Sequence, residues 1–234
     1  MSERSATEPR SGRTIALIGV DGSGKTTIAR RLATSISATY VYMGTNPGSA
    51  SHELPTTRWI RTLQQRLGRP ARYEGGPPRR PAAGQSPKPP SVVRRLRSAA
   101  YVTRLMTEEL YRQALIRRAT RRGETVLVDR HFFFDYFAHD VTGASGTRTV
   151  VQRVHGWLLR RLPRPQVVIL LDAPAEVVYG RKPEGRLEEL VSRRREYLAL
   201  AERFPAIRTV NAARSIDQVE ADVRHIIDAA LTPQ

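Results

Sequence analysis

Short apolar runs alternate with longer amphipathic segments along the chain, and this alternation predicts its secondary structure. The runs at 14–20, 39–43, 125–129 and 166–172 are brief and almost continuously apolar, which is typical of strands buried on both faces of a parallel sheet. A weaker fifth strand is expected at 208–211. Because strands alternate with helices, we expect an α/β fold built as a three-layer α/β/α sandwich around a five-stranded parallel sheet.

Apolar residues spaced by three or four positions predict the connecting helices. They are expected at 24–37, 91–122, 148–161, 174–179 and 187–203, and from Ser215 onwards. The longest of them should end at Gly123, since glycine commonly terminates a helix. Its expected apolar face consists of Val92, Leu96, Ala99, Val102, Leu105, Leu110, Ala114 and Leu115.

Residues 68–90 interrupt this alternation. They contain seven proline and four glycine residues, a density that neither a helix nor a sheet tolerates. We therefore expect a flexible Pro/Arg-rich insert within one domain that spans 1–234. A short helix should precede the insert at 56–67, with Trp59 and Leu63 on its apolar face.

Composition narrows the possible chemistry. The chain has no cysteine, which excludes disulfides, thiolate catalysis and cysteine-ligated metal sites. Its five histidines show no metal-binding spacing. The N-terminal segment has no apolar region of the kind that signal peptides carry, and no apolar stretch approaches the ~20 residues of a membrane span. These features lead us to expect a cytoplasmic protein.

The positive charge is concentrated in one segment. The net charge is 39 − 22 = +17, and residues 56–104 carry eleven arginines and Lys88 against the single acid Glu74. A nucleic-acid partner is not expected, because the charge is local rather than spread over the chain. The segment suits peripheral contact with an anionic membrane, at its inner face; the alternative is that its apolar stripe packs on the protein itself.

A glycine-rich motif carries the strongest chemical signal. Residues 19–26 (GVDGSGKT) match GxxxxGK[ST] between a predicted strand and a predicted helix, which is the context that this motif requires. Its glycines let backbone N–H groups converge on phosphate oxygens at a helix N-terminus. Lys25 is expected to reach the β- and γ-phosphates, and the Thr26 hydroxyl to bind Mg²⁺.

Charged residues also follow later strands. Asp129 and Arg130 end the third strand, where open α/β sheets bind ligands: the carboxylate can hold a Mg²⁺-bound water and the guanidinium can bind a phosphate. A surface pair that caps a helix is the alternative. Asp172, at the end of the fourth strand, either orients the metal or caps the helix near Pro174, and we favour the cap.

Two further segments allow two interpretations each. Residues 181–186 (RKPEGR) combine three cations with proline and glycine, as in a loop that closes over a transferred phosphoryl group or in an ordinary solvated loop. Residues 132–137 hold five of the 15 aromatic residues. They either surround a flat substrate group or belong to the core.

These residues together resemble the thymidylate kinase family of P-loop nucleoside monophosphate kinases. The resemblance rests on the phosphate loop at 19–27, the Asp-Arg-His at 129–131 and the lid-like 181–186, and it covers about 1–55 and 91–234. It implies a P-loop kinase fold with strand order 2-3-1-4-5, ATP and Mg²⁺ as donor, and a small-molecule phosphate acceptor.

The resemblance also implies roles for particular residues. ATP would be bound by Gly19, Asp21, Gly22, Ser23, Gly24, Lys25, Thr26, Thr27, Arg186 and Asn211. The acceptor would be bound by Asp21, Glu108, Arg130, His131 and Phe134. Lys25, Arg130 and Arg181 would act in catalysis, and Thr26 and Asp129 would hold the metal.

The acceptor side departs from the family pattern. Members usually carry Arg-Glu-Pro-Gly-Gly after the second strand, whereas residues 43–48 read MGTNPG. Glu108 falls near the position of an acceptor-binding arginine, and Phe134 stands where a small hydroxyl residue is common. Similar sequences with such a stretch include thymidylate kinase-like proteins without a known substrate, some linked to glycan assembly.

We therefore expect an ATP-dependent kinase whose nominal reaction is dTMP + ATP to dTDP + ADP. One alternative is a kinase of a nucleoside, sugar or polyol in glycan or secondary metabolism. An alternative of another class is a nucleotide-dependent ATPase or switch that binds nucleic acid or a membrane through 56–104. A homodimer is also considered.

Overall fold

The computed structural model describes residues 12–44, 62, 66, 92–143, 149–183 and 186–231. The insert at 68–90 lies outside the described residues. So does the predicted helix at 56–67, apart from Thr62 and Arg66, which are helical. The membrane contact assigned to 56–104 therefore stays a prediction. Within the described part of the chain, no helix combines the length and the apolar character that crossing a membrane would require.

The five predicted strands all form, and each begins and ends within two residues of its expected position. They are β1 (Thr14–Ile18), β2 (Thr39–Tyr42), β3 (Val126–Asp129), β4 (Val167–Asp172) and β5 (Ile207–Asn211). They form one parallel sheet in the order β2-β3-β1-β4-β5, as the sequence predicted. β1 lies at the centre and is buried along its whole length. The three-layer P-loop kinase fold is thereby confirmed.

The helices follow the expected order. They are α1 (Lys25–Ser35), α3 (Val92–Arg121), α4 (Phe132–Asp135), the π-helical turn η1 (Phe137–Val141), α5 (Val150–Arg161), α6 (Ala175–Arg181), α7 (Leu187–Arg203) and α8 (Ile216–Leu231). The sequence did not predict α4 and η1. α4 lies in the aromatic segment and η1 begins at its last residue, Phe137, and the consecutive apolar residues there show no helical period.

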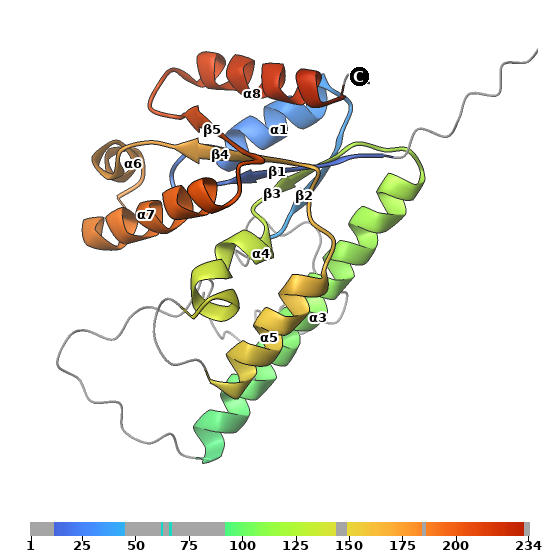
Figure 1. Cartoon of the computed structure of the whole chain (residues 1–234), viewed down its shortest axis with the longest axis vertical. Coiled ribbons are helices and arrows are strands. Elements are labelled where there is room, and N and C mark those ends of the chain that lie inside the picture. The colour runs from blue at the N-terminus through green and yellow to red at the C-terminus, as the bar shows by residue number, and fades with distance from the viewer. Residues whose placement is uncertain are drawn as a thin grey trace, which may run out of the picture. The chain divides into compact units, whose positions relative to one another are not determined.

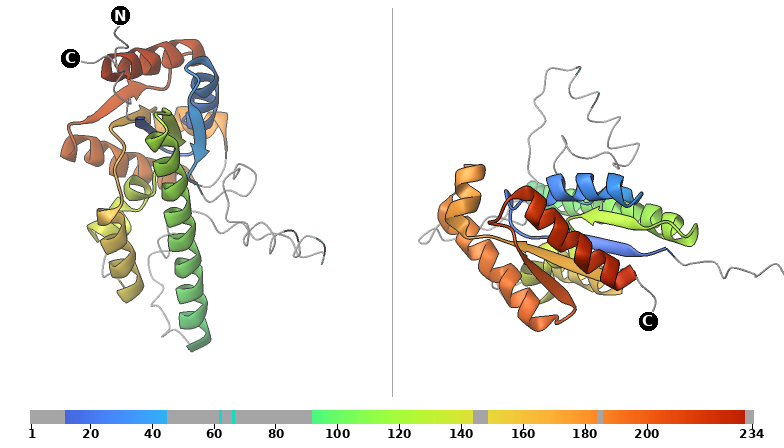
Figure 2. Two further views of the ribbon diagram at one scale, coloured as in Figure 1. Left: turned by 90° about the vertical axis from the view of Figure 1, so that its right-hand side faces the viewer. Right: turned by 90° about the horizontal axis from the view of Figure 1, so that it is seen from above.

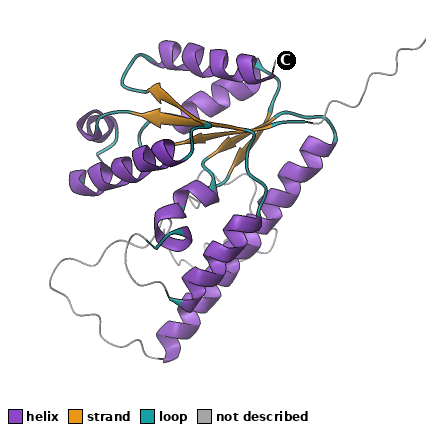
Figure 3. Cartoon of the chain, viewed as in Figure 1, coloured by secondary structure: helices purple, strands orange, loops and turns teal. Residues whose placement is uncertain are grey.

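The chain forms two compact units. The first comprises Met1–Val41, Ala114–Asp129 and Pro165–Gln234, and it contains most of the sheet. The second comprises Tyr42–Gln113 and Arg130–Arg164. In the first unit, α1 and α8 lie over one face of the sheet and α7 over the other (Figures 1 and 3). The view from above in Figure 2 shows α8 crossing the strands beside α1.

Parallel pairing brings the carboxyl ends of the strands to one edge of the sheet. Leu17 of β1 pairs with Asp129 of β3, and Asp172 of β4 pairs with Asn211 of β5. The loop that follows β1 therefore begins beside Asp129. Charged or polar residues that end these strands meet where ligands bind open α/β sheets.

The second unit has an aromatic core. All five aromatic residues at 132–137 are buried, as the core interpretation expected. The ring of Phe133 packs edge-on against Phe134 and Phe137, with centroids 5.2 and 5.3 Å apart. Such edge-to-face pairs add to the hydrophobic stabilisation of burial.

The predicted apolar face of α3 is wrong in its middle part. Leu110 is 46% exposed, whereas Glu108, Glu109 and Arg112 are buried. The helix turns polar side chains inward because their hydrogen-bonding partners lie there: His155 of α5 for Glu109, and the Gly44 carbonyl for Arg112. Buried charges are tolerated only when they are paired in this way.

Candidate functional site

The phosphate loop connects β1 to α1, and its glycines are required by the backbone. Gly19, Gly22 and Gly24 have φ angles of 140°, 88° and 91°, which L-residues rarely adopt. A Cβ on Gly19 would also lie 2.5 Å from the Leu171 carbonyl oxygen. Gly24 is the N-cap of α1 and provides no side-chain cap. The positive end of the helix therefore faces this loop, as anion binding requires.

Lys25 lies inside the loop. Its side chain is buried, and Nζ donates to the Val20 carbonyl at 2.6 Å and to Ser23 Oγ at 3.4 Å. Both acceptors belong to the loop itself. The ammonium group is therefore held at the centre of the segment predicted to bind phosphates, where it can exchange these contacts for phosphate oxygens.

Thr26 and Asp129 meet in the first unit, as their predicted shared role requires. Thr26 Oγ1, in the first turn of α1, donates to Asp129 Oδ2 at 2.6 Å. Asp129 ends β3 and is fully buried. A hydroxyl and a carboxylate are hard oxygen ligands of the kind that Mg²⁺ prefers, and Mg²⁺ sites with few protein ligands are completed by nucleotide phosphates and water. These residues fit a Mg·nucleotide.

The same carboxylate has a second donor that the sequence did not reveal. The hydroxyl of Tyr40 on β2 donates to Asp129 Oδ2 at 3.0 Å. Burial, followed by the charge of Asp129, raises the pKa of Tyr40 well above its usual value. The Tyr40 hydroxyl therefore keeps its proton and remains a donor.

The predicted lid begins beside the phosphate loop. A Cβ on Gly22 would lie 2.9 Å from Val178 Cγ1 and 3.5 Å from Lys182 Cβ. The end of α6 therefore packs on the loop. Arg186 is 74% exposed and lies 3.6 Å from Glu188, so it makes only a solvated surface pair.

Arg181 contacts the segment after β5 in this structure. Its guanidinium donates to the carbonyl oxygens of Ala212 at 2.7 Å and Ala213 at 3.3 Å. Asn211 Oδ1 in turn accepts from the Ala213 N–H at 2.9 Å. Arg181 of α6 and Asn211 of β5 therefore both make hydrogen bonds with the turn that follows β5.

The cap interpretation of Asp172 is wrong. Pro174 is the N-cap of α6, and no side chain caps that helix. The Asp172 carboxylate instead accepts two hydrogen bonds from Arg194 of α7, at 2.7 and 2.8 Å. This bidentate pair joins β4 to α7.

In the second unit, Arg130 has an unusual backbone. Its φ of 72° is in the left-handed region, one of only two such angles at non-glycine residues among those described. Strain of this kind is concentrated at functional sites. The guanidinium lies 4.0 Å from the Asp135 carboxylate.

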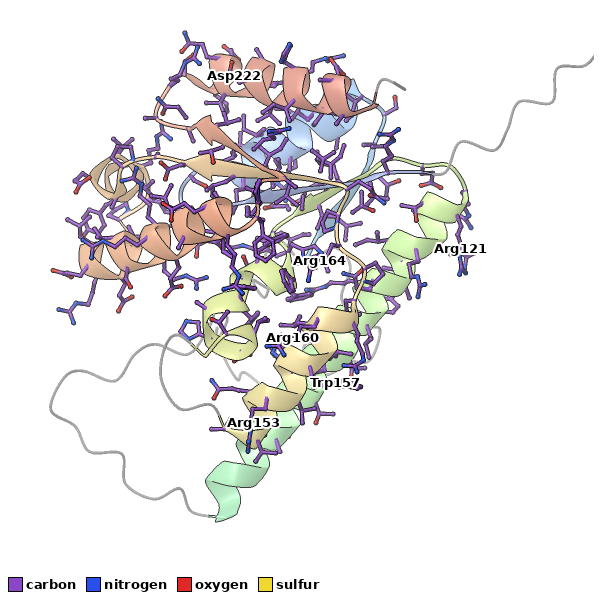
Figure 4. All side chains as sticks on the ribbon, in the orientation of Figure 1. Arg121, Arg153, Trp157, Arg160, Arg164 and Asp222 are labelled. Atoms are coloured by element: carbon purple, nitrogen blue, oxygen red, sulfur yellow. The ribbon has the colours of Figure 1, made fainter. Side chains whose placement is uncertain are left out.

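His131 and Phe134 are buried beside each other in the second unit, with ring centroids 5.5 Å apart. Burial, together with the positive charge of Arg164, lowers the pKa of His131 to about 4. Arg164, which is labelled in Figure 4, has its guanidinium 4.4 Å from the centroid of the Phe133 ring. His131 is therefore neutral near pH 7, and it can act there as a hydrogen-bonding group but not as a cation.

Glu108 is paired within its own helix. Arg112 Nη2 lies 3.4 Å from Glu108 Oε2, and Arg112 Nη1 donates to the Gly44 carbonyl at 3.0 Å. A Cβ on Gly44 would collide with the Tyr42 hydroxyl and would lie 2.7 Å from Arg130 Cδ. Both neighbours belong to long side chains, so a larger residue at position 44 would displace Tyr42 or Arg130.

The second unit contains a buried ionic cluster that was not predicted from the sequence. His155 of α5 lies between Asp140 of η1 and Glu109 of α3, at 2.6 and 2.9 Å. Burial disfavours its charged form, but the hydrogen bonds with Asp140 and Glu109 outweigh burial and raise the pKa of His155 to about 9. No local sequence signal marks this cluster, because its three members come from separate helical segments.

Comparison with known proteins finds similar sequences among probable thymidylate kinases. A probable thymidylate kinase of Thermococcus gammatolerans is 30% identical over 122 residues, covering 49% of this chain and 56% of the relative. That of Thermococcus onnurineus is 33% identical over 128 residues, with coverage of 50% and 58%. That of Pyrococcus horikoshii is 32% identical over 120 residues, with coverage of 47% and 54%.

The chain thus spans little more than half the length of these curated relatives. No protein-family model matches it. The relatives support a thymidylate kinase-like family, the one that the phosphate loop and the Asp-Arg-His segment resemble.

Proposed function

We propose that the chain is an ATP-dependent kinase that transfers the γ-phosphoryl group of Mg·ATP to a small-molecule acceptor. The observation that carries the proposal is the contact of 2.6 Å between Thr26 and Asp129, beside the loop that encloses Lys25. The relatives, which are named as probable thymidylate kinases, support a phosphotransferase.

On the donor side, the residues of the first unit have separate tasks. The loop from Gly19 to Thr27 binds the phosphates through backbone N–H groups, and Lys25 stabilises negative charge as it develops on the transferred group. Thr26 and Asp129 hold Mg²⁺, which would neutralise the charge of the β- and γ-phosphates when bound. Asn211 belongs to the turn that we assign to the adenine side.

The transfer itself needs no protein nucleophile. An acceptor oxygen bonds to the γ-phosphorus while the bond to the β–γ bridging oxygen breaks, which yields ADP and the phosphorylated acceptor. Arg130 holds the acceptor, and Arg181 and Arg186 close over the transferred group. Arg181 reaches that group only if it gives up its hydrogen bonds to Ala212 and Ala213.

The nominal acceptor class is a nucleoside monophosphate, which the names of the relatives and the Asp-Arg-His segment support. Within this class dTMP is the first compound to test, and the altered acceptor side leads us to expect that it is not the best acceptor. His131 and Phe134 would line its site with neutral surface, and Asp21 would accept a hydrogen bond from a hydroxyl of its sugar.

A second acceptor class has its own support. The stretch at 43–48 lacks the charged pair of the family pattern, and buried Glu108 adds an anionic group where a cation would favour a phosphate. A nucleoside, sugar or polyol has hydroxyl groups that can donate to a carboxylate. We therefore retain a kinase of such an acceptor as the second candidate.

The test is a screen for ADP release with nucleoside monophosphates, nucleosides and sugars as acceptors. Acceptor-dependent ADP release that is lost in Lys25→Ala supports the kinase. ADP release that needs no acceptor, or only nucleic acid or vesicles, supports the ATPase or switch instead. The homodimer and the membrane contact through 56–104 are separate proposals, which sedimentation and vesicle flotation test.

A further inference from the structure

Three elements of the first unit converge on one carboxylate oxygen. Oδ2 of Asp129, at the end of β3, accepts from Thr26 Oγ1 at 2.6 Å and from the Tyr40 hydroxyl at 3.0 Å. Thr26 lies on α1 and Tyr40 on β2. Only the threonine belongs to the phosphate-loop motif, so the tyrosine is an addition that the motif does not explain.

Two hydrogen-bond donors to one oxygen restrict the rotation of the Asp129 carboxylate about its Cβ–Cγ bond. The last torsion of an aspartate side chain is broad, so a carboxylate with a single contact can rotate about its Cβ–Cγ bond. A second donor from a different element restricts this rotation. The direction of the other oxygen, Oδ1, is then also determined. Groups that orient a metal ligand in this way typically change metal affinity about 10- to 100-fold when they are removed.

The tyrosine is itself held in place. Its ring lies under the guanidinium of Arg30, 5.8 Å from the ring centroid, while its hydroxyl reaches Asp129. Arg30 and Thr26 lie one turn apart on α1. The same helix therefore positions the threonine hydroxyl directly and the tyrosine through a cation–π contact.

We infer that Tyr40 is a positioning residue that orients the Asp129 carboxylate for the metal of the bound nucleotide. This inference rests on the proposed function. In this role Tyr40 does not contact the nucleotide and acts only through Asp129. The competing explanation is structural, namely that the hydrogen bond merely joins β2 to β3 and contributes to stability.

Metal binding separates the two explanations. Mn²⁺, a Mg²⁺ substitute with a paramagnetic signal, is titrated into the protein with ADP, and its dissociation constant is measured by electron paramagnetic resonance. Tyr40→Phe keeps the ring and removes the hydroxyl. We expect it to weaken Mn²⁺ binding about tenfold, the range of such orienting groups. ADP binding without metal should change less than twofold.

A double-mutant cycle then tests whether Tyr40 acts through Asp129. In the Asp129→Asn background, Tyr40→Phe should alter Mn²⁺ binding less than twofold, because the carboxylate that it orients is gone. Tyr197→Phe, which removes the hydroxyl of a buried tyrosine on α7, is the matched control and should leave Mn²⁺ binding unchanged. Thermal unfolding of each variant verifies that the fold is retained.

The outcomes distinguish this inference from the proposed function. Unchanged Mn²⁺ binding in folded Tyr40→Phe, or an equal loss in the Asp129→Asn background, would overturn the role of Tyr40 and leave the kinase proposal intact. A chain that binds no Mn·ADP at all would overturn both. Failure to find an acceptor affects only the proposed function, because the titration contains no acceptor.

Discussion

The hydroxyl of Thr26 donates a hydrogen bond of 2.6 Å to Oδ2 of Asp129, although 103 positions separate the two residues. Parallel pairing of β1 with β3 creates this contact, since Leu17 and Asp129 are register partners and the phosphate loop starts just beyond Leu17. A motif residue and a strand-end carboxylate thereby form one oxygen site for a metal.

The first prediction concerns Lys25. Replacing it by alanine should lower kcat at least 100-fold, because the ammonium group acts on charge that grows in the transition state, where such a contact is worth roughly 10²- to 10³-fold. Steady-state kinetics of Lys25→Ala, with circular dichroism as the check of folding, measure the effect. Lys25→Met, which retains the apolar stem, is the matched variant. Turnover above about a tenth of the wild type would refute this role.

The second prediction assigns Arg130 to the acceptor. Arg130→Lys keeps the charge but loses the planar pair of donors that binds a phosphate oxygen pair, so activity should fall about 100-fold or more while the Kd of ATP changes little. Arg153→Lys, at an exposed position of α5, is the control. A large rise in the Kd of ATP with an unchanged acceptor KM would move Arg130 to the donor side.

The third prediction is that dTMP is a poor acceptor. Glu108 is buried, and a second anion near it is unfavourable unless Arg112 offsets both charges. We expect kcat/KM for dTMP below about 10⁵ M⁻¹s⁻¹, which is low on the usual enzyme scale. An acceptor with more hydroxyl groups and less charge should perform better in the same assay. Efficient phosphorylation of dTMP would contradict this prediction and support the thymidylate kinase reaction, dTMP + ATP to dTDP + ADP.

The fourth prediction concerns pH and stability. The pKa of His155 rises from its ordinary value of 6.5 to about 9 in the folded chain. Its stabilising effect is therefore complete below about pH 6.5 and is lost as the pH rises towards 9. Glu109, whose pKa is raised mainly by burial, changes stability in the same direction. Both groups, with Asp140, face each other across α3, η1 and α5.

Urea unfolding between pH 6 and 10 measures this dependence. The free energy of unfolding should fall between about pH 6.5 and 9, and His155→Gln should reduce the slope in this window while lowering stability at pH 6. His225→Gln, at an exposed position of α8, is the control. An unchanged slope in His155→Gln would show that the cluster does not titrate as described.

Local patterns predicted the sheet and most helices because buried parallel strands and amphipathic helices leave periodic signals. α4 and η1 lacked such a signal, since the apolar residues at 132–134 and 136–138 are consecutive rather than spaced by three or four positions. The buried face of α3 was missed for a different reason. Glu109 accepts a hydrogen bond there from His155 of α5, a partner distant in sequence.

The candidate site was likewise predictable only where its features depend on local sequence. The residue types and spacing of the phosphate loop could be identified from sequence, because a local backbone shape carries its chemistry. The contact of Tyr40 with Asp129 depends on which strands neighbour each other and on their register, and a single strand does not reveal either. The left-handed backbone of Arg130 likewise follows from packing rather than from residue type.

The most direct test of phosphoryl transfer is to follow the label of γ-³²P-ATP with the best acceptor from the screen. If the chain is a kinase, labelled acceptor and ADP should form in equal amounts, both should require Mg²⁺, and Lys25→Ala should form neither at a comparable rate. Label that appears as inorganic phosphate in proportion to ADP, with no labelled acceptor, would contradict the kinase and indicate an ATPase.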